Sequence, residues 1–125
     1  MKVLIVDDSD SIRKIICGML RELGLEVLEA SHGVEALAQL SVHPDIGLVT
    51  LDWNMPKMNG MEFLEALKTQ HAYRQTPTIL MVTTENEKGK VVLALTKGAH
   101  EYIMKPFTKE VLQEKLALLG IQTSN

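Results

Sequence analysis

Acidic, hydroxyl and basic side chains follow four apolar segments of this sequence, at the point where each segment ends. They are Asp7 and Asp8 after residues 2–6, Asp52 after residues 46–51, Thr83 after residues 78–82 and Lys105 after residues 102–104. Carboxylates that share one pocket repel each other, by about 4 kcal/mol for two charges roughly 4 Å apart at an effective dielectric of about 20. A divalent cation relieves that repulsion, and oxygen ligands without a nearby Cys or His favour Mg²⁺. The pattern therefore indicates a magnesium site.

The same residues have the functional groups that phosphoryl transfer needs. Asp52 has a nucleophilic carboxylate, Lys105 has a positive charge for a phosphoryl oxygen, and the Thr83 hydroxyl can donate a hydrogen bond to another oxygen. Each residue alone also has a structural explanation, since Asp7 and Asp8 suit a turn or a helix cap. Their joint occurrence at four strand ends favours a site that neutralises phosphoryl charge around Asp52.

The elements that would bring these residues together alternate between short β-branched segments and segments with helical periodicity. Strands are expected at residues 2–6, 25–29, 46–51, 78–82 and 102–104, and helices at residues 9–23, 34–40, 62–68, 88–96 and 108–119. Five βα units in one short chain predict an α/β fold with a doubly wound, five-stranded parallel sheet that helices cover on both faces. The working residues of such sheets gather beyond the carboxyl ends of the strands.

Composition excludes several classes of function. The chain has 125 residues, a formal net charge of −3 and 46% hydrophobic residues, so it has no basic stripe for nucleic acid or a membrane surface. No apolar stretch reaches the length of a transmembrane helix, and the first apolar run is too short for a signal peptide. Cys17 is the only cysteine, so we expect a cytoplasmic protein without an internal disulfide. We expect a monomer with one domain at residues 1–120, a frayed tail at residues 121–125 and no output domain.

The order of the polar residues resembles a known family. The matching positions are Asp7-Asp8, Asp52, Thr83 and Lys105-Pro106-Phe107, together with the segment DWNMPKMNG at residues 52–60. They resemble the receiver domain of two-component response regulators, and most closely the single-domain chemotaxis regulators of CheY type. The resemblance covers residues 1–119. It implies a flavodoxin-like sheet with strand order 2-1-3-4-5, for which this family is itself a standard example.

The metal and phosphorylation roles that the resemblance implies centre on Asp52. This residue is expected to accept the phosphoryl group and to bind Mg²⁺ together with Asp8 and the backbone carbonyl of Asn54. Asp7 is expected to act mainly through a metal-bound water. The family also implies a cis peptide bond before Pro106, which X-Pro sequences form at low cost.

The switching roles that the resemblance implies involve three other residues. The Thr83 hydroxyl would move onto the phosphoryl group, with Lys105 as its charge partner and Tyr102 as an aromatic switch. Asn54 and Glu85 are expected to tune dephosphorylation, because each lies two positions after a matched residue at the mouth of the pocket.

The implied partners are a sensor histidine kinase and a downstream target protein, for instance the flagellar motor switch. The target is expected on the face formed by helix 88–96, strand 102–104 and helix 108–119. Residues 91–95 are apolar on more than one face of their helix, so part of that surface should remain exposed. Thr84 departs from the family pattern, which usually has a smaller residue there, and its branched side chain narrows access to the pocket.

Other functions stay open on the sequence alone. A phosphorelay shuttle or a developmental single-domain regulator would have the same site. A phosphatase of haloacid-dehalogenase type also uses an aspartate nucleophile, but it needs a second aspartate where this chain has Asn54. A flavodoxin-like FMN carrier must hold phosphate in its first loop, where Asp7 and Asp8 would repel it. We therefore expect a phosphorylation-controlled signalling module and not an enzyme.

Overall fold

The computed structural model describes residues 1–53, 55, 58–70 and 76–124, with only the backbone for Gln70, Glu85 and Asn86. These residues form a sheet of five parallel strands in the order β2-β1-β3-β4-β5, as predicted. The strands are β1 (Lys2–Val6), β2 (Glu26–Ala30), β3 (Ile46–Asp52), β4 (Thr78–Thr83) and β5 (Glu101–Met104). The β-branched and aliphatic residues that fill β1, β3 and β4 suit strands buried on both faces, whereas the edge strands β2 and β5 are only partly buried.

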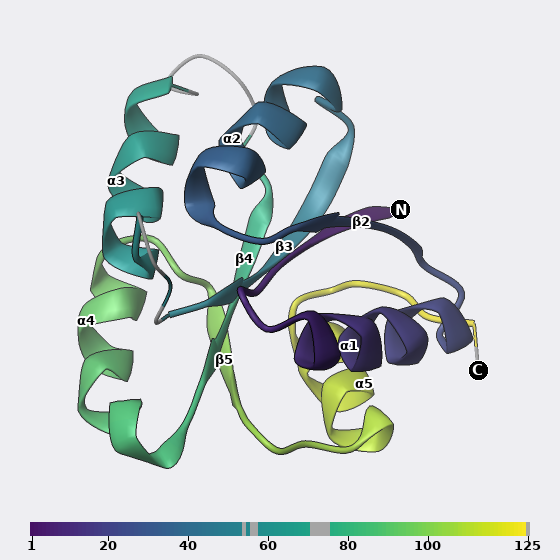
Figure 1. Ribbon diagram of the computed structural model, residues 1–125. Coiled ribbons are helices and arrows are strands. Elements are labelled where there is room, and N and C mark those ends of the chain that lie inside the picture. Colours follow the sequence, from purple (N-terminus) through teal and green to yellow (C-terminus); the bar gives the residue numbers. More distant parts are fainter. Residues whose placement is uncertain (54, 56–57, 71–75, 125) are drawn as a thin grey trace.

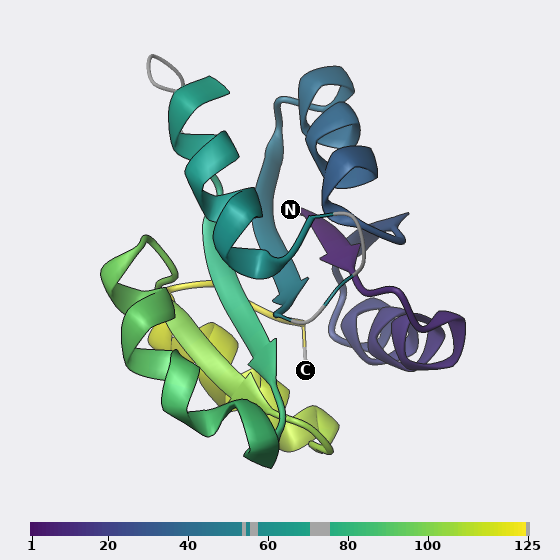
Figure 2. The ribbon, with the colours of Figure 1, turned by 60° about the vertical axis from the view of Figure 1, so that its left-hand side comes forward.

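Five α-helices and one 3₁₀ segment connect these strands in the described part of the chain. They are α1 (Asp10–Glu22), α2 (Gly33–Val42), α3 (Gly60–Gln70), η1 (Glu85–Lys90), α4 (Val91–Thr96) and α5 (Lys109–Leu118). Helices α1 and α5 cover one face of the sheet, and α2, α3 and α4 cover the other (Figures 1 and 2). The predicted doubly wound α/β fold is therefore confirmed.

The face of the sheet under α1 and α5 is closed by a cluster of buried aliphatic side chains. Helix α1 begins after Ser9, whose hydroxyl accepts a hydrogen bond from the N–H of Ile12 at 3.3 Å. The chain leaves the helix through Gly24, whose φ of 85° lies in the left-handed region that glycine tolerates. Cys17 is fully buried in this layer, and burial raises the pKa of its thiol.

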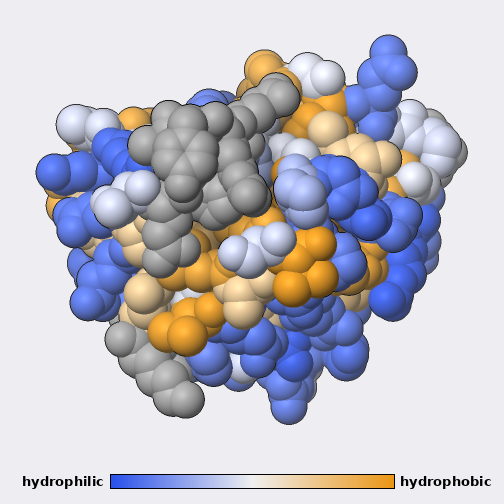
Figure 3. Space-filling model, turned by 90° about the horizontal axis from the view of Figure 1, so that it is seen from above, coloured by the Kyte–Doolittle hydropathy of each residue, from blue (hydrophilic) through white to orange (hydrophobic). Residues whose placement is uncertain are grey.

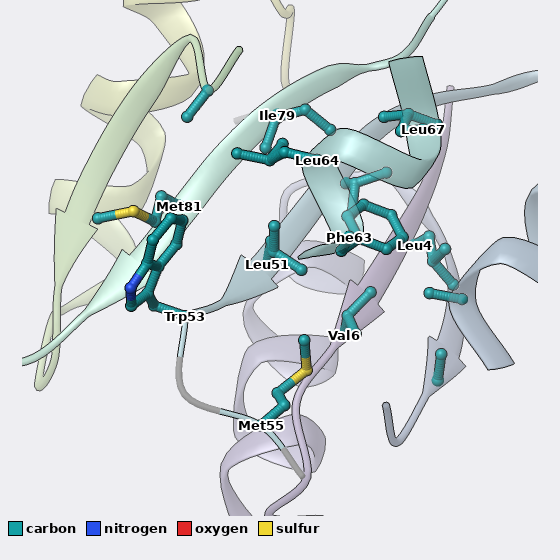
Figure 4. Close-up of a cluster of buried hydrophobic side chains, with 14 of the residues drawn as sticks. Leu4, Val6, Leu51, Trp53, Met55, Phe63, Leu64, Leu67, Ile79 and Met81 are labelled. Carbon is teal, nitrogen blue, oxygen red and sulfur yellow. The ribbon is translucent and has the colours of Figure 1, made fainter. Parts of the chain in front are cut away.

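The face under α2, α3 and α4 holds the second cluster, which Figure 4 shows in close-up. Phe63, Leu64 and Leu67 project from α3 into this cluster, and Trp53 joins it with only 5% of its surface exposed. Gly60 at the start of α3 allows a close approach, because a Cβ atom there would lie 2.5 Å from the Trp53 ring. The carboxyl end of β3 is therefore anchored against α3.

The connection between β4 and α4 differs from the prediction. The sequence periodicity predicts one helix over residues 88–96, whereas a 3₁₀ segment covers Glu85–Lys90 and α-helical geometry begins only at Val91. A glycine inside the segment disfavours the α-helix, and short 3₁₀ turns are common at helix starts. On α4 itself, Val92 and Leu93 are 74% and 47% exposed, so the predicted apolar surface is confirmed.

The end of the chain is more closely packed than predicted. Ile121 is 7% exposed and belongs to the cluster under α1 and α5, and the N–H of Ser124 donates to the carbonyl of Leu23 at 2.9 Å. The prediction of a frayed tail at residues 121–125 is therefore wrong for these two residues. Gly120 has a φ of 77°, and this turn lets the next apolar side chain fold back onto the core.

One end of the molecule, which Figure 3 shows from above, has hydrophobic residues near its middle with hydrophilic residues around them. Exposed apolar side chains of this kind are normal on a folded domain. Within the described residues, no helix is both long enough and apolar enough to cross a membrane.

Candidate functional site

The strand register places the predicted polar residues at one edge of the sheet. The last residue pairs between neighbouring strands are Val6 with Leu51, Asp52 with Val82 and Thr83 with Met104. One further step along β1 places Asp7 beside Asp52, and one further step along β5 places Lys105 just beyond Thr83. Four strands therefore deliver their polar residues to the same place, where the sheet order reverses around β1.

Three carboxylates meet at this edge. Asp7, Asp8 and Asp52 each offer one carboxylate oxygen, and these three oxygens lie within 4.8 Å of one another. Asp7 and Asp52 are only 2% and 5% exposed, whereas Asp8 faces solvent. The cluster thus has a buried floor of two acids and an open side toward water.

Asp7 is held in place by its own loop and by α1. Its Oδ1 accepts a hydrogen bond from the N–H of Ser9 at 2.9 Å, and its backbone carbonyl accepts one from Nη1 of Arg13 at 2.7 Å. Arg13 is itself tied to β2, because its Nε donates to Oε1 of Glu29 at 2.9 Å. The other carboxylate oxygen of Asp7, Oδ2, is buried and accepts no hydrogen bond from the described residues.

Lys105 supplies a counter-charge to the two buried acids. Its Nζ lies 3.6 Å from Oδ2 of Asp7 and 3.7 Å from Oδ1 of Asp52, beyond the range of a direct hydrogen bond. Its backbone N–H donates to the carbonyl of Thr83 at 2.7 Å, which fixes the loop after β5 to the end of β4. The Lys105–Pro106 peptide bond is cis, as the resemblance implied.

The hydroxyl of Thr83 is occupied within its own loop. Thr83 is fully buried, and its Oγ1 donates to the carbonyl of Thr84 at 3.3 Å. The N–H and the hydroxyl of Thr84 both donate to Oε1 of Glu87, at 3.2 and 3.1 Å. Glu87 is 7% exposed, and its Oε2 is buried without a hydrogen-bond partner in the described part of the chain.

Tyr102 lies on β5, three positions before Lys105, and is half-buried. The ammonium of Lys115 sits over its ring, 4.4 Å from the ring centre. Glu101 links the two residues, because its Oε1 accepts the N–H of Tyr102 at 2.9 Å and lies 3.4 Å from Nζ of Lys115. Tyr102 and Lys115 line a surface groove of about 530 Å³ together with Val111 of α5.

The structure leaves two predicted roles undescribed and adds two residues that the sequence interpretation missed. Asn54 and the side chain of Glu85 lie outside the described residues. Arg13 was missed because one arginine on a helix gives no signal for its contact with a strand-end carbonyl. Glu87 was missed although Thr84 and Glu87 form the pattern T-x-x-E, which is typical of a helix capping box.

The donor atoms of the acidic cluster fit Mg²⁺. Carboxylate oxygens from Asp7, Asp8 and Asp52 form a hard set of ligands without nitrogen or sulfur, and the exposed side leaves room for waters, which Mg²⁺ retains. The buried Oδ2 of Asp7 is the strongest sign, because it accepts no hydrogen bond from the described residues and has the Lys105 ammonium only at 3.6 Å, so a bound cation would satisfy it.

Comparisons with known proteins show which proteins this chain resembles. The response regulator receiver domain family matches residues 3–117. The chain is 46% identical to chemotaxis protein CheY1 of Helicobacter pylori over 120 residues, and this match covers 95% of this chain and 96% of that protein. It is 49% identical to a CheY homolog of Campylobacter jejuni over 117 residues, and this match covers 93% of this chain and 89% of that protein. The solved structure of chemotaxis protein CheY4 from Vibrio cholerae superposes with a TM-score of 0.83 at 40% identity, covering 94% and 96%.

Proposed function

This chain belongs to the response regulator receiver family, and on that premise we propose that it accepts a phosphoryl group on Asp52 from a sensor histidine kinase. Phosphorylation would change its affinity for a downstream protein in chemotaxis, the process that names its relatives in Helicobacter pylori and Campylobacter jejuni. The proposed output is binding and not the turnover of an external substrate. The cytoplasm, where such kinases present their phosphoryl groups, is the proposed compartment.

The observation that carries this proposal is the position of Asp52. Its carboxylate ends β3 beside two other acids and 3.7 Å from the Lys105 ammonium. A carboxylate that only capped a loop would need neither the acidic neighbours, which repel it, nor a lysine from a different strand. Both features suit a nucleophile that must receive a group with negative charge on its oxygens.

In the proposed transfer, one oxygen of Asp52 forms a bond to the phosphorus atom of a phosphohistidine on the kinase. The phosphorus–nitrogen bond breaks, its electron pair stays on the imidazole nitrogen, and an acyl phosphate remains on Asp52. Lys105 lies close enough to pair with one phosphoryl oxygen. Asp7, Asp8 and Asp52 would hold Mg²⁺, and the ion would supply charge neutralisation for the approach of the dianionic group to the acids.

The acyl phosphate would change the surface through Thr83. The negative oxygens offer the Thr83 hydroxyl a stronger acceptor than the neutral Thr84 carbonyl that it now meets. Thr83 pairs with Met104 on β5, two positions after Tyr102, so a movement at the strand end reaches the groove between β5 and α5. The populations of the resting and altered surfaces then shift together.

The proposed binding face for the target combines α4, β5 and α5. It contains the exposed Val92 and Leu93 of α4, Val111 of α5, and the groove that Tyr102 and Lys115 line. The groove is also lined by Met104, the residue that pairs with Thr83, which supports this face over the remainder of the surface.

The test uses acetyl phosphate as a small phosphoryl donor in the presence of Mg²⁺. The wild type should form an acid-labile acyl phosphate on Asp52, and Asp52→Asn should lose it while keeping its fold, because an amide is a poor nucleophile. Asp45→Asn is the matched control, since Asp45 is exposed and pairs with Lys2 away from the site. Labelling of Asp52→Asn at the wild-type level would disprove the assignment, and steady turnover of phosphate esters would favour a phosphatase.

A further inference from the structure

Glu87 is a buried carboxylate that the phosphorylation chemistry does not use. It lies in η1, beyond the end of β4, and only 7% of its surface is exposed. It makes no ion pair among the described residues. One of its oxygens, Oε2, is buried without a hydrogen bond. Such a group is costly to keep in a folded protein, so it calls for an explanation.

The contacts of Glu87 all go to one neighbour. Its Oε1 accepts both the N–H and the hydroxyl of Thr84, at 3.2 and 3.1 Å. The carbonyl of the same Thr84 accepts the Thr83 hydroxyl at 3.3 Å. The chain at the end of β4 is thus fixed at consecutive positions, with the Thr83 hydroxyl engaged by a neighbour that Glu87 holds.

We propose that Glu87 is a positioning residue, which clamps Thr84 and thereby keeps the Thr83 hydroxyl in its resting arrangement until Asp52 is phosphorylated. The inference rests on the proposed function and adds the residue that sets its resting bias. When the Thr83 hydroxyl turns to the phosphoryl group, the clamp on Thr84 opens and the Glu87 carboxylate gains access to water.

The clamp is suited to this task because two opposing effects leave only a small net stabilisation of the closed form. Hydrogen bonds to a charged acceptor stabilise the closed form, while the unpartnered Oε2 destabilises it. A ligand shifts an equilibrium only through its different affinities for the two states, and it does so with less cost when the states are close in free energy. The clamp therefore holds Thr83 without making the switch unresponsive.

Beryllofluoride, which mimics a phosphoryl group on a carboxylate, is the probe for the first test. Its affinity is measured by calorimetry in excess Mg²⁺. Glu87→Ala removes both hydrogen bonds and should bind beryllofluoride about threefold to tenfold more tightly than the wild type, because the resting state loses its stabilisation. Glu87→Gln retains an acceptor oxygen for Thr84 and should stay within about twofold of the wild type.

Two further variants make the inference independent of simple damage to the fold. Thr84→Val keeps the shape of the side chain and removes one of the two clamp hydrogen bonds, so it should tighten binding less than Glu87→Ala does. The double variant should bind no more tightly than Glu87→Ala alone, since both substitutions act on one clamp. Glu65→Ala removes an exposed glutamate of α3 and should leave the affinity unchanged.

The second test measures the resting protein without any ligand. The Thr84 amide should exchange its hydrogen faster in Glu87→Ala than in the wild type or in Glu87→Gln, as NMR can follow. Equal tightening by the Ala and Gln variants would overturn the clamp, because it would assign the effect to the loss of negative charge. Unchanged affinity and unchanged exchange in Glu87→Ala would overturn it as well. Absence of beryllofluoride binding by the wild type would instead refute the proposed function, while the amide exchange would still test the clamp.

Discussion

At the scale of single residues, Lys105 contributes positive charge to the surroundings of Asp52. Three carboxylates lie together at the strand ends, and Lys105 is shared between Asp7 and Asp52 at distances longer than a hydrogen bond. An ammonium held in this way is not saturated by either partner, so it can move onto a new anion without breaking a short contact. The position of the Lys105 ammonium therefore suits the phosphorylated form of Asp52 better than the unphosphorylated form.

Lys105→Ala should weaken beryllofluoride binding by at least about tenfold, because a buried anion loses its charge-assisted partner. Mg²⁺ binding should persist in this variant, since the oxygen ligands remain. Calorimetry with each ligand separates the two effects. Lys109→Ala is the control, because Lys109 pairs with Glu22 at 3.1 Å away from the site and should change neither affinity. Wild-type affinity for beryllofluoride in Lys105→Ala would contradict the role of this residue.

Sequence reasoning could find the residues that act at the strand ends but not those that hold them. Asp52 and Lys105 interrupt apolar segments with a charge, and in a parallel sheet such interruptions converge at one edge. Arg13 and Glu87 act through particular backbone atoms, and those contacts depend on the exact path of the loops. Of these two, only Glu87 has a local pattern in the sequence, because it lies three positions after Thr84.

At the scale of elements, the strands matched their sequence patterns more closely than the helices did. Apolar runs buried on both faces have sharp ends where polar residues begin, so the predicted strand at residues 46–51 differs from β3 by one residue. Helix ends depend on caps that act over three or four residues. The pair Asn59 and Glu62 extends α3 beyond its predicted start, since each side chain accepts the other's backbone N–H, at 2.9 and 3.0 Å.

One ion-pair group ties α1 to β2 and supports the first acidic loop. Glu29 accepts hydrogen bonds from Lys14 at 2.9 Å and from Arg13 at 2.9 Å, and the hydrogen bond from Lys14 chiefly lowers the pKa of Glu29. A lowered folded pKa means that the stabilisation is present above the unfolded pKa near 4.5 and is lost as the pH falls through the folded pKa.

Glu29→Gln should therefore lower the free energy of unfolding by about 1 kcal/mol near neutral pH, a modest value because the carboxylate is partly exposed to water. The difference from the wild type should shrink as the pH is lowered from about 5 toward 3, and urea unfolding at several pH values measures it. Glu65→Gln, at an exposed position of α3, should show no such dependence. A constant difference across this range would contradict the assignment.

At the scale of the whole molecule, the core and the site place opposite demands on the same sheet. Two hydrophobic clusters, one on each face, fix the strands so that their polar ends converge. That convergence brings three acids together, and their mutual repulsion destabilises the metal-free fold. Cation binding should therefore appear as added stability of the entire domain, and not only as a local event.

Mg²⁺ at millimolar concentration should raise the midpoint of thermal unfolding relative to NaCl at matched ionic strength, because the ion binds the folded state and relieves the repulsion. Asp8→Ala should behave in the opposite way. Without Mg²⁺ this variant should be more stable than the wild type by about 1 kcal/mol, a modest value because Asp8 is exposed and its charge is screened. It should gain little stability from the ion.

The fluorescence of Trp53 reports Mg²⁺ binding in the same samples, because this buried residue follows Asp52 directly. We expect saturable quenching of its emission in the wild type, and we expect Asp8→Ala and Asp52→Ala to lose this quenching. Asp45→Ala controls for the loss of an acidic charge, because Asp45 is exposed and pairs with Lys2 away from the cluster. If Mg²⁺ changed neither the wild-type midpoint nor the Trp53 emission, the acidic cluster would not be a metal site.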